Sequence, residues 1–326
     1  MKAPLFEECS RAMSFLGNLI PGYRPFRYTG ENVACNLCGS TEKAVLATRD
    51  RWLNPLTNVI CTHCGLIRVD PMPTDAELER YYANHYRLHY QSTLEPTPKS
   101  IDRGQKSAKA RLDHLQQFLK PGARILDIGA GGGEFLAEAK SRGYEVEGVE
   151  PSVGFARYAE RTYGVKVHIA PLNKIDFGSR KFDLIHSFHV FEHLRDPFAS
   201  MELVHTLLKP DGYFYVAVPN MAEKRTPTGM FHFAHVHGFA YETLRMMGEK
   251  AGFEWVPSTA LRAAQVFKRL DAPRSDWFRF PKHAAELEKK FREARLSKHL
   301  LSADPYRRAW GRLKRKLGER KLKAAG

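Results

Sequence analysis

Residues 124–135 read Arg-Ile-Leu-Asp-Ile-Gly-Ala-Gly-Gly-Gly-Glu-Phe, a short apolar run that passes into a glycine-rich turn and then into helix-forming residues. The pattern predicts a buried strand, a tight turn and a helix. Glycine permits such a turn and lets a ligand approach the backbone where a Cβ atom would otherwise stand. The glycines concerned are Gly129, Gly131 and Gly133. This segment therefore predicts a ligand site at the start of a helix in an α/β domain.

Strand and helix patterns alternate after this segment. Strand patterns at 144–150, 165–169, 182–188 and 213–219 are separated by helical stretches, which begin at Glu134, at Ser152 and near residue 198. A further helix with one apolar face is expected from Ser107. This alternation is typical of a doubly wound, mainly parallel sheet, so the expected fold class is α/β.

An acidic residue ends the second strand of this series. Glu150 lies 17 residues beyond Gly133 (150 − 133), at the end of the strand pattern 144–150. A carboxylate in this position can accept hydrogen bonds from both hydroxyl groups of a ribose. The glycine turn and this acid together predict a ligand that contains a nucleoside.

The spacing Asp-x-Gly-x-Gly-x-Gly, which starts at Asp127, resembles motif I of the class I S-adenosylmethionine-dependent methyltransferases. Segments 182–197, 208–220 and 232–253 are similar to later segments of the branch that includes ubiquinone-type O-methyltransferases and sugar or natural-product methyltransferases. The resemblance implies a Rossmann-like methyltransferase sheet with S-adenosyl-L-methionine as cofactor. It also implies that Asp127 helps to hold the amino end of the cofactor.

Two further places are expected to contact the cofactor. Ser187 and Phe188, at the end of the fourth strand, are assigned to the cofactor site. The family often has an acid after the third strand to bind the adenine amine, whereas this chain has Ala-Pro-Leu-Asn at 170–173. Adenine recognition is therefore expected from the backbone of Leu172 or from Asn173, with Asp176 as the alternative.

Histidines follow the fourth strand, near the expected position of the methyl group. His189 and His193 flank Glu192, and a histidine that titrates near neutrality suits removal of a proton from a methyl acceptor. His193 is favoured as base or orienting group, although it can instead cap the next helix or bond to Glu192. A second cluster is expected over the acceptor side and consists of His232, His235 and His237.

The string His189-x-x-Glu192-His193 also matches a metalloprotease motif, which requires a helix. It follows a strand here, which argues against a protease. It also resembles the Glu-x-x-Glu-His stretch of the ubiquinone-type enzymes, implicated there in divalent-metal binding, with His189 in place of the first acid.

Four cysteines form two Cys-x-x-Cys-Gly knuckles. Four thiolates at this spacing can close a tetrahedral shell, which predicts a structural zinc ribbon, with a rubredoxin-like iron site as the alternative. The expected ligands are Cys35, Cys38, Cys61 and Cys64, and only Cys9 is left over. This usage fits a reducing cytoplasm rather than a disulfide framework.

The 326-residue chain is expected to divide into five parts. These are an N-terminal helical segment at 1–30, the zinc ribbon at 31–70, a helical connector and linker at 71–105, the methyltransferase domain at 106–270 and a basic helical tail at 271–326. The linker itself is placed at 93–104. No apolar run is long enough to span a membrane.

The formal net charge of +15 is unevenly distributed. Residues 271–326 hold 17 Lys and Arg against 7 Asp and Glu, so +10 of the charge (17 − 7) lies there. Residues 306–323 form a basic amphipathic pattern. It suits peripheral association with an anionic membrane at the inner face or binding to an acidic partner, and the alternative is packing on the catalytic domain.

These features predict methyl transfer to oxygen or carbon of a small-molecule, sugar or lipid-linked acceptor. An RNA methyltransferase is the second hypothesis. It is disfavoured because no basic groove with stacking aromatics is evident beside the glycine turn. A non-catalytic adaptor with the cofactor fold is the third, and the intact glycine turn with Glu150 argues against it.

Overall fold

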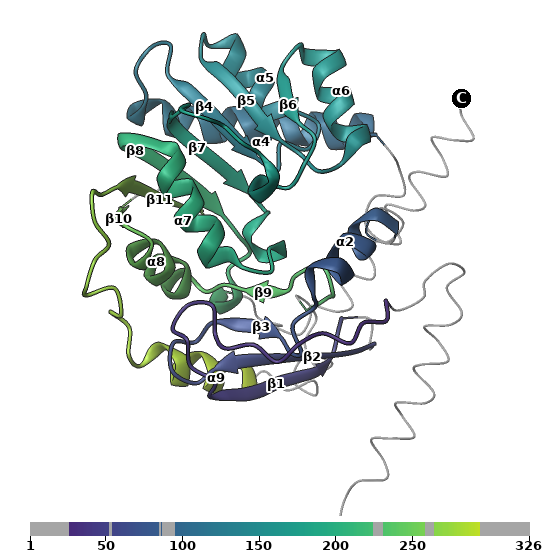
Figure 1. Ribbon diagram of the computed structural model, residues 1–326, viewed down its shortest axis with the longest axis vertical. Helices are drawn as coiled ribbons and strands as arrows, with labels where there is room; N and C mark the ends of the chain where they lie inside the picture. Colours follow the sequence, from purple (N-terminus) through teal and green to yellow (C-terminus); the bar gives the residue numbers. More distant parts are fainter. Residues whose placement is uncertain are drawn as a thin grey trace, which may run out of the picture.

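The computed structural model describes residues 26–51, 54–84, 86, 95–223, 231–257 and 264–293. Within them, a seven-stranded sheet and a four-stranded sheet lie one below the other in Figure 1. Most of the predicted segment 1–30 and the basic pattern at 306–323 fall outside these residues.

The larger sheet is mainly parallel, as predicted. Its strand order is β10-β11-β8-β7-β4-β5-β6, with the five strands from β8 to β6 parallel and β10 and β11 antiparallel at one edge. The chain runs outward through β5 and β6 and then returns to the other side of β4. Ligands of such sheets bind at the carboxyl ends of the strands where this reversal occurs, here β4 and β7. The strands are β4 (Arg124–Ile128), β5 (Glu145–Val149), β6 (Lys166–His168), β7 (Phe182–Phe188), β8 (Leu208–Ala217), β10 (Phe253–Val256) and β11 (Ala264–Arg269).

Helices cover both faces of this sheet because successive side chains of a strand point to opposite sides. Ile125 and Leu184 pack with α4 and α5, whereas Leu126 and Ile185 pack with α7 and α8. Helix α6 packs beside α5. The helices are α4 (Pro98–Leu115), α5 (Glu134–Ser141), α6 (Val153–Tyr163), α7 (Pro197–Leu207) and α8 (Tyr241–Lys250). Short 3-10 turns are η1 (Gln116–Phe118), η2 (Leu172–Lys174), η3 (Phe191–His193) and η4 (Met221–Glu223).

Helix α4 begins well before Ser107, so the prediction of a linker through residue 104 was wrong. Thr97 caps the helix by accepting a hydrogen bond from Ser100 N at 3.3 Å, and Pro98 occupies the first turn. Proline is favourable there because its fixed φ suits the helix and the missing N–H has no intrahelical partner. The prolines therefore start this helix instead of interrupting it.

The smaller sheet is the ribbon, and it takes its last strand from the larger domain. Its order is β1-β2-β3-β9, with β1 (Lys43–Arg49), β2 (Pro55–Cys61), β3 (Ile67–Val69) and β9 (His237–Gly238). Strand β9 comes from the segment between β8 and α8 and pairs Gly238 with Ile67. Leu37 and Leu66 of the ribbon share one apolar core with Met247 of α8. The ribbon and the larger domain are thus packed as one body.

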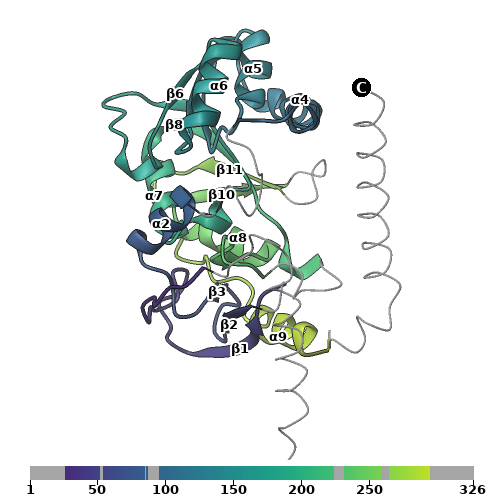
Figure 2. The same ribbon diagram turned by 90° about the vertical axis from the view of Figure 1, so that its right-hand side faces the viewer.

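Two helices flank the ribbon (Figures 1 and 2). Helix α2 (Asp75–Asn84) begins at a reciprocal cap, in which Thr74 N donates to Glu77 Oε2 and Glu77 N donates to Thr74 Oγ1. Helix α9 (His283–Glu293) lies in the predicted tail, yet Leu287 packs against Ile60 of the ribbon. The first part of that segment is therefore a packed element. Among the described helices, none combines the length and the apolar character that a membrane crossing requires.

Candidate functional site

The glycine turn between β4 and α5 is held open by backbone conformation. Gly129, Gly131 and Gly133 all have positive φ, at 74°, 55° and 85°. A Cβ atom on Gly129 would lie 2.2 Å from Val190 Cγ2, and one on Gly133 would lie 2.6 Å from Ala159 Cβ. A Cβ atom on Gly131 would meet no atom of the described residues within 4 Å. Packing thus requires the outer glycines, whereas Gly131 faces space that the described residues leave open to a ligand.

Glu150 lies directly beside this turn. Its Oε2 accepts a hydrogen bond from Gly131 N at 3.0 Å, and its Oε1 accepts one from Ser152 N at 2.8 Å. A carboxylate has about four lone-pair directions, so ribose hydroxyls can still donate to it. The structure therefore brings together the turn and the acid that the sequence predicted.

The segment expected to meet the adenine follows β6. Leu172 has a buried side chain in η2, and Asn173 is exposed. Asp176 Oδ1 accepts a hydrogen bond from Gly178 N at 2.7 Å, so this carboxylate closes a local turn. No described contact joins these residues to the glycine turn, and their assignment to the adenine stays a prediction.

Ser187 and Phe188 end β7, next to β4. Ser187 is fully buried, and its hydroxyl oxygen has no hydrogen-bond partner among the described residues. Phe188 packs under the guanidinium of Arg111, with 4.1 Å from Cζ to the ring centroid. The unpartnered hydroxyl at the switch point fits a residue that contacts a ligand.

Asp127 belongs to a buried cluster that sequence reasoning missed. His186 Nδ1 lies 2.6 Å from Asp127 Oδ1, and Arg111 Nε lies 3.1 Å from His186 Nε2. Burial lowers the pKa of His186, and Arg111 adds to this effect. No spacing rule links residues from α4, β4 and β7, and a histidine inside a strand pattern reads as an ordinary core residue.

The histidines after β7 surround a buried acid. Glu192 is 2% exposed, and its Oε1 accepts a hydrogen bond from His189 Nδ1 at 3.1 Å. The other oxygen, Oε2, has no partner among the described residues. His189 has a φ of 58°, a sparsely populated conformation for a residue with a Cβ atom, and such conformations cluster at functional sites.

His193 has one ring nitrogen committed and one available. Its Nδ1 donates to Ala234 O at 2.7 Å, which fixes the tautomer and leaves Nε2 as an acceptor. Nε2 lies 3.9 Å from Glu192 Oε1. The His193 ring also lies 4.9 Å from that of His235, centroid to centroid. This arrangement suits proton acceptance at Nε2 with a carboxylate close by.

Two members of the second histidine cluster, His232 and His235, lie near His193, whereas the third binds other partners. His235 joins His193 and Glu192, and one donor atom from each of the three lies within 4.8 Å of the others. The His232 ring lies 3.8 Å from that of His235, centroid to centroid, at a tilt of 47°. Burial, with Arg51 and His193 nearby, lowers the pKa of His232 to about 2. Burial, with His232 and His193 nearby, also lowers the pKa of His235.

His237, predicted as catalytic, lies elsewhere on β9 in the ribbon sheet. Its Nδ1 donates to Leu194 O at 2.9 Å, and its Nε2 lies 3.1 Å from the side-chain position assigned to Asn36 Oδ1. Burial lowers the pKa of His237 to about 4, so the ring is neutral and Nε2 can only accept. The Asn36 amide must therefore be turned so that its N–H₂ group faces Nε2. Both nitrogens are thereby occupied, and His237 ties the first cysteine knuckle to the loop after η3. His237 therefore has no ring nitrogen available for a methyl acceptor, in contrast to the prediction that it is catalytic.

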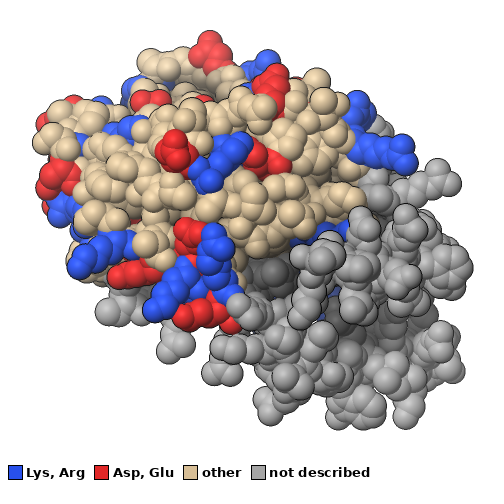
Figure 3. Space-filling view, turned by 90° about the horizontal axis from the view of Figure 1, so that it is seen from below, with Lys and Arg blue, Asp and Glu red and all other residues tan. Residues whose placement is uncertain are grey.

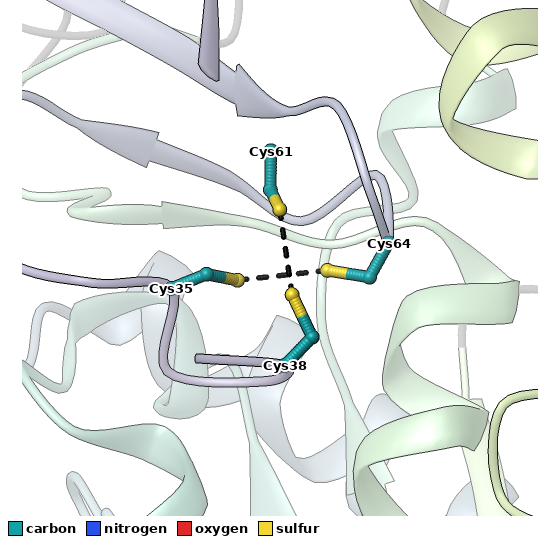
Figure 4. Close-up of side chains that lie close together, drawn as sticks. All are labelled: Cys35, Cys38, Cys61 and Cys64. Carbon is teal, nitrogen blue, oxygen red and sulfur yellow. Dashed lines mark hydrogen bonds between the residues drawn. The ribbon is translucent and has the colours of Figure 1, made fainter. Parts of the chain in front are cut away.

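The four predicted metal ligands converge in the ribbon (Figure 4). The Sγ atoms of Cys35 and Cys64 lie 3.5 Å apart, as do those of Cys38 and Cys61. Zinc–sulfur bonds of about 2.3 Å in a tetrahedron require sulfur–sulfur edges of about 3.8 Å, so the cluster fits a metal of this kind. Each knuckle closes through its glycine, since Gly39 N donates to Cys35 O and Gly65 N to Cys61 O. Four thiolates would leave no open coordination position on a bound metal, so such a metal would have a structural role.

The charge distribution bears on the nucleic-acid hypothesis. On the face that Figure 3 shows, Lys and Arg side chains of the described residues lie beside Asp and Glu side chains. Elsewhere among the described residues, Arg195 pairs with Glu31, and Arg142 pairs with Glu138 and Asp113. The described part of the face in Figure 3 thus carries mixed charge, unlike the single-sign basic area that binds a phosphate backbone.

Comparison with known proteins identifies a family model and relatives that are similar to this chain. Residues 102–258 match a family model described as a methyltransferase domain. The chain is 33% identical over 128 residues to a ubiquinone biosynthesis O-methyltransferase of Actinobacillus pleuropneumoniae serotype 5b, a match that covers 35% of this chain and 54% of that protein. A ubiquinone biosynthesis O-methyltransferase of Xanthomonas axonopodis pv. citri is 33% identical over 125 residues, covering 36% and 50%. The chain thus spans about half the length of these curated relatives.

Among solved structures, a Burkholderia thailandensis 1,6-didemethyltoxoflavin-N1-methyltransferase with bound S-adenosylhomocysteine is 19% identical, with a TM-score of 0.48. That similarity covers 71% of this chain and all of the other.

Proposed function

Because residues 102–258 form a class I, Rossmann-like methyltransferase domain, we propose that this protein transfers a methyl group from S-adenosyl-L-methionine to oxygen or carbon of a small-molecule acceptor. The observation that carries the proposal is the contact between Gly131 N and Glu150 Oε2 at the carboxyl ends of β4 and β5. This contact brings together a turn whose backbone a ligand can approach and an acid that suits a ribose.

When bound, the cofactor would supply an electrophilic methyl carbon on a cationic sulfonium, with the neutral thioether S-adenosylhomocysteine as the leaving group opposite the acceptor atom. The protein then has to orient the two molecules, exclude water and remove a proton from the acceptor. Asp127 would pair with the ammonium of the methionine portion, and Glu150 with the ribose hydroxyls. Ser187, which pairs with Ile128 of β4, has a hydroxyl group without a hydrogen-bond partner among the described residues and would hydrogen-bond the ligand.

His193 is the residue we assign to proton removal. Its Nε2 is free to accept because Nδ1 is bound to Ala234 O. When the ring takes up the acceptor's proton, Glu192 at 3.9 Å stabilises the imidazolium. His189, which is 44% exposed and hydrogen-bonded to Glu192, orients that carboxylate.

The same residues also support a metal-assisted variant of this function. Glu192, His193 and His235 offer one carboxylate and two imidazoles within 4.8 Å, a donor set that suits a divalent cation. The buried, unpartnered Glu192 Oε2 favours this second candidate. A cation bound there would lower the pKa of an acceptor hydroxyl.

The acceptor that we propose is a small molecule, sugar or lipid-linked compound, and the similarity to a ubiquinone biosynthesis O-methyltransferase supports a small-molecule acceptor. Isothermal titration of the purified protein with S-adenosylhomocysteine, followed by turnover assays on phenolic, sugar and lipid-linked acceptors, tests the proposal. Chelator-treated enzyme assayed with and without added Mg²⁺ or Zn²⁺ distinguishes the two variants. Lack of any cofactor binding by folded protein would refute the function.

A further inference from the structure

A chain of three buried side chains runs beneath the glycine turn. Arg111 comes from α4, His186 from β7 and Asp127 from β4. Arg111 Nε lies 3.1 Å from His186 Nε2, and His186 Nδ1 lies 2.6 Å from Asp127 Oδ1. All three residues are less than 10% exposed. A cation and an anion are thus linked through one imidazole ring in the interior.

The direction of these hydrogen bonds is determined by chemistry. A guanidinium can only donate, so Nε2 of His186 must accept. The single ring proton is then on Nδ1 and points at Asp127. Burial and the nearby Arg111 both lower the pKa of His186, which keeps the ring neutral. Asp127 Oδ1 therefore accepts a hydrogen bond from His186 Nδ1, and the ring proton cannot move to Nε2 because that nitrogen accepts from Arg111.

Aromatic packing locks the ring in this orientation. His186 stacks on Phe135 at 3.7 Å with an interplanar angle of 11°, and on Tyr215 at 5.0 Å with an angle of 2°. Arg111 is fixed in turn by Phe188, at 4.1 Å, and by a hydrogen bond to Ser107. Since neither ring nor guanidinium can turn freely, Asp127 is held in one rotamer.

We propose that Arg111 and His186 are positioning residues that hold the Asp127 carboxylate for the ammonium group of the methyl donor. This inference rests on the proposed function. His186 takes up Oδ1 and leaves the second oxygen for a ligand, while the Arg111 charge stabilises the ionised carboxylate in the interior. Without these partners, the Asp127 side chain would lose the hydrogen bond that fixes its rotamer, and its carboxylate would no longer be aligned with an ammonium group.

The test compares two ligands that differ at the relevant end. S-adenosylhomocysteine carries the ammonium group, and 5′-methylthioadenosine lacks the whole amino-acid portion. His186→Phe keeps the aromatic stack and removes the donor to Asp127. We expect it to weaken S-adenosylhomocysteine binding roughly 10- to 100-fold in calorimetry and to leave 5′-methylthioadenosine binding unchanged. His186→Asn, which can donate again, should recover part of the loss.

A matched control is Tyr215→Phe, which keeps the other stacking ring and removes only a hydroxyl; its affinities for both ligands should equal those of the wild type. If His186→Phe does not fold, Arg111→Met provides the same comparison, because it removes the donor that fixes the imidazole proton. Equal losses for both ligands, or no loss for either, would overturn the inference while leaving the proposed function standing. Wild-type protein that binds neither ligand would overturn both.

Discussion

Replacing Gly131 by alanine should separate a backbone cost from a cofactor effect. Gly131 has a φ of 55°, and a Cβ atom there would meet no atom of the part of the chain that the structure describes within 4 Å. Alanine in this left-handed conformation costs about 1 kcal/mol of folding free energy. The added methyl group would project into the space assigned to the cofactor. We expect the dissociation constant for S-adenosylhomocysteine to rise at least about tenfold, or about 1.4 kcal/mol.

Gly178 provides a matched control for this substitution. Its φ is 56°, and a Cβ atom there would also meet no described residue within 4 Å, but Gly178 lies in the turn that follows η2. Gly178→Ala should show the same loss in urea unfolding as Gly131→Ala and unchanged cofactor binding in calorimetry. If both variants bind S-adenosylhomocysteine equally well, the space beside Gly131 is not the cofactor site.

Four other predictions follow from the ribbon, the histidines and the charge distribution. Elemental analysis should find about one zinc per chain, and Cys61→Ser should lose the metal and unfold at lower temperature; a metal-free protein that stays folded would contradict the assignment. His193→Ala should lower turnover about 10²- to 10⁴-fold at unchanged cofactor affinity, and more than His189→Ala does, whereas wild-type rates for both would exclude them as base. The pKa of His237 is about 4 in the folded protein and about 6.5 for a histidine exposed to water in the unfolded chain. Between these two pH values the unfolded chain binds more protons than the folded protein. The free energy of unfolding should therefore fall as the pH drops through this window. In urea unfolding, His237→Gln should lose about 2 kcal/mol less than the wild type between pH 7 and pH 5, and an identical loss would show that this histidine is not the cause. Residues 306–323, outside the described part of the chain, should support salt-sensitive binding to anionic liposomes, and a chain ending at Ala303 should bind less; equal binding at low salt would exclude a membrane role.

Local patterns in the sequence were sufficient to predict the glycine turn with its neighbouring acid and the cluster of four cysteines. The glycine turn, Glu150 and the cysteine knuckles each depend on residues whose spacing fixes their geometry, because a turn or a strand end places neighbours along the chain. The alternation of strands and helices likewise predicted the parallel sheet. Thr97 and Pro98 also carried a local signal for the start of α4, which was interpreted as a linker.

Tertiary structure alone decided which distant side chains meet. The sequence could not show that Arg111 and His186, 75 positions apart, would join Asp127 under the turn. Nor could it show that β9 would complete the ribbon sheet, which changes His237 from a catalytic candidate into a buried link to Asn36. The sequence does not show whether the ring nitrogens of a histidine face a ligand or a protein carbonyl. Its role depends on burial and on partners from other elements, and these exist only once the chain has packed.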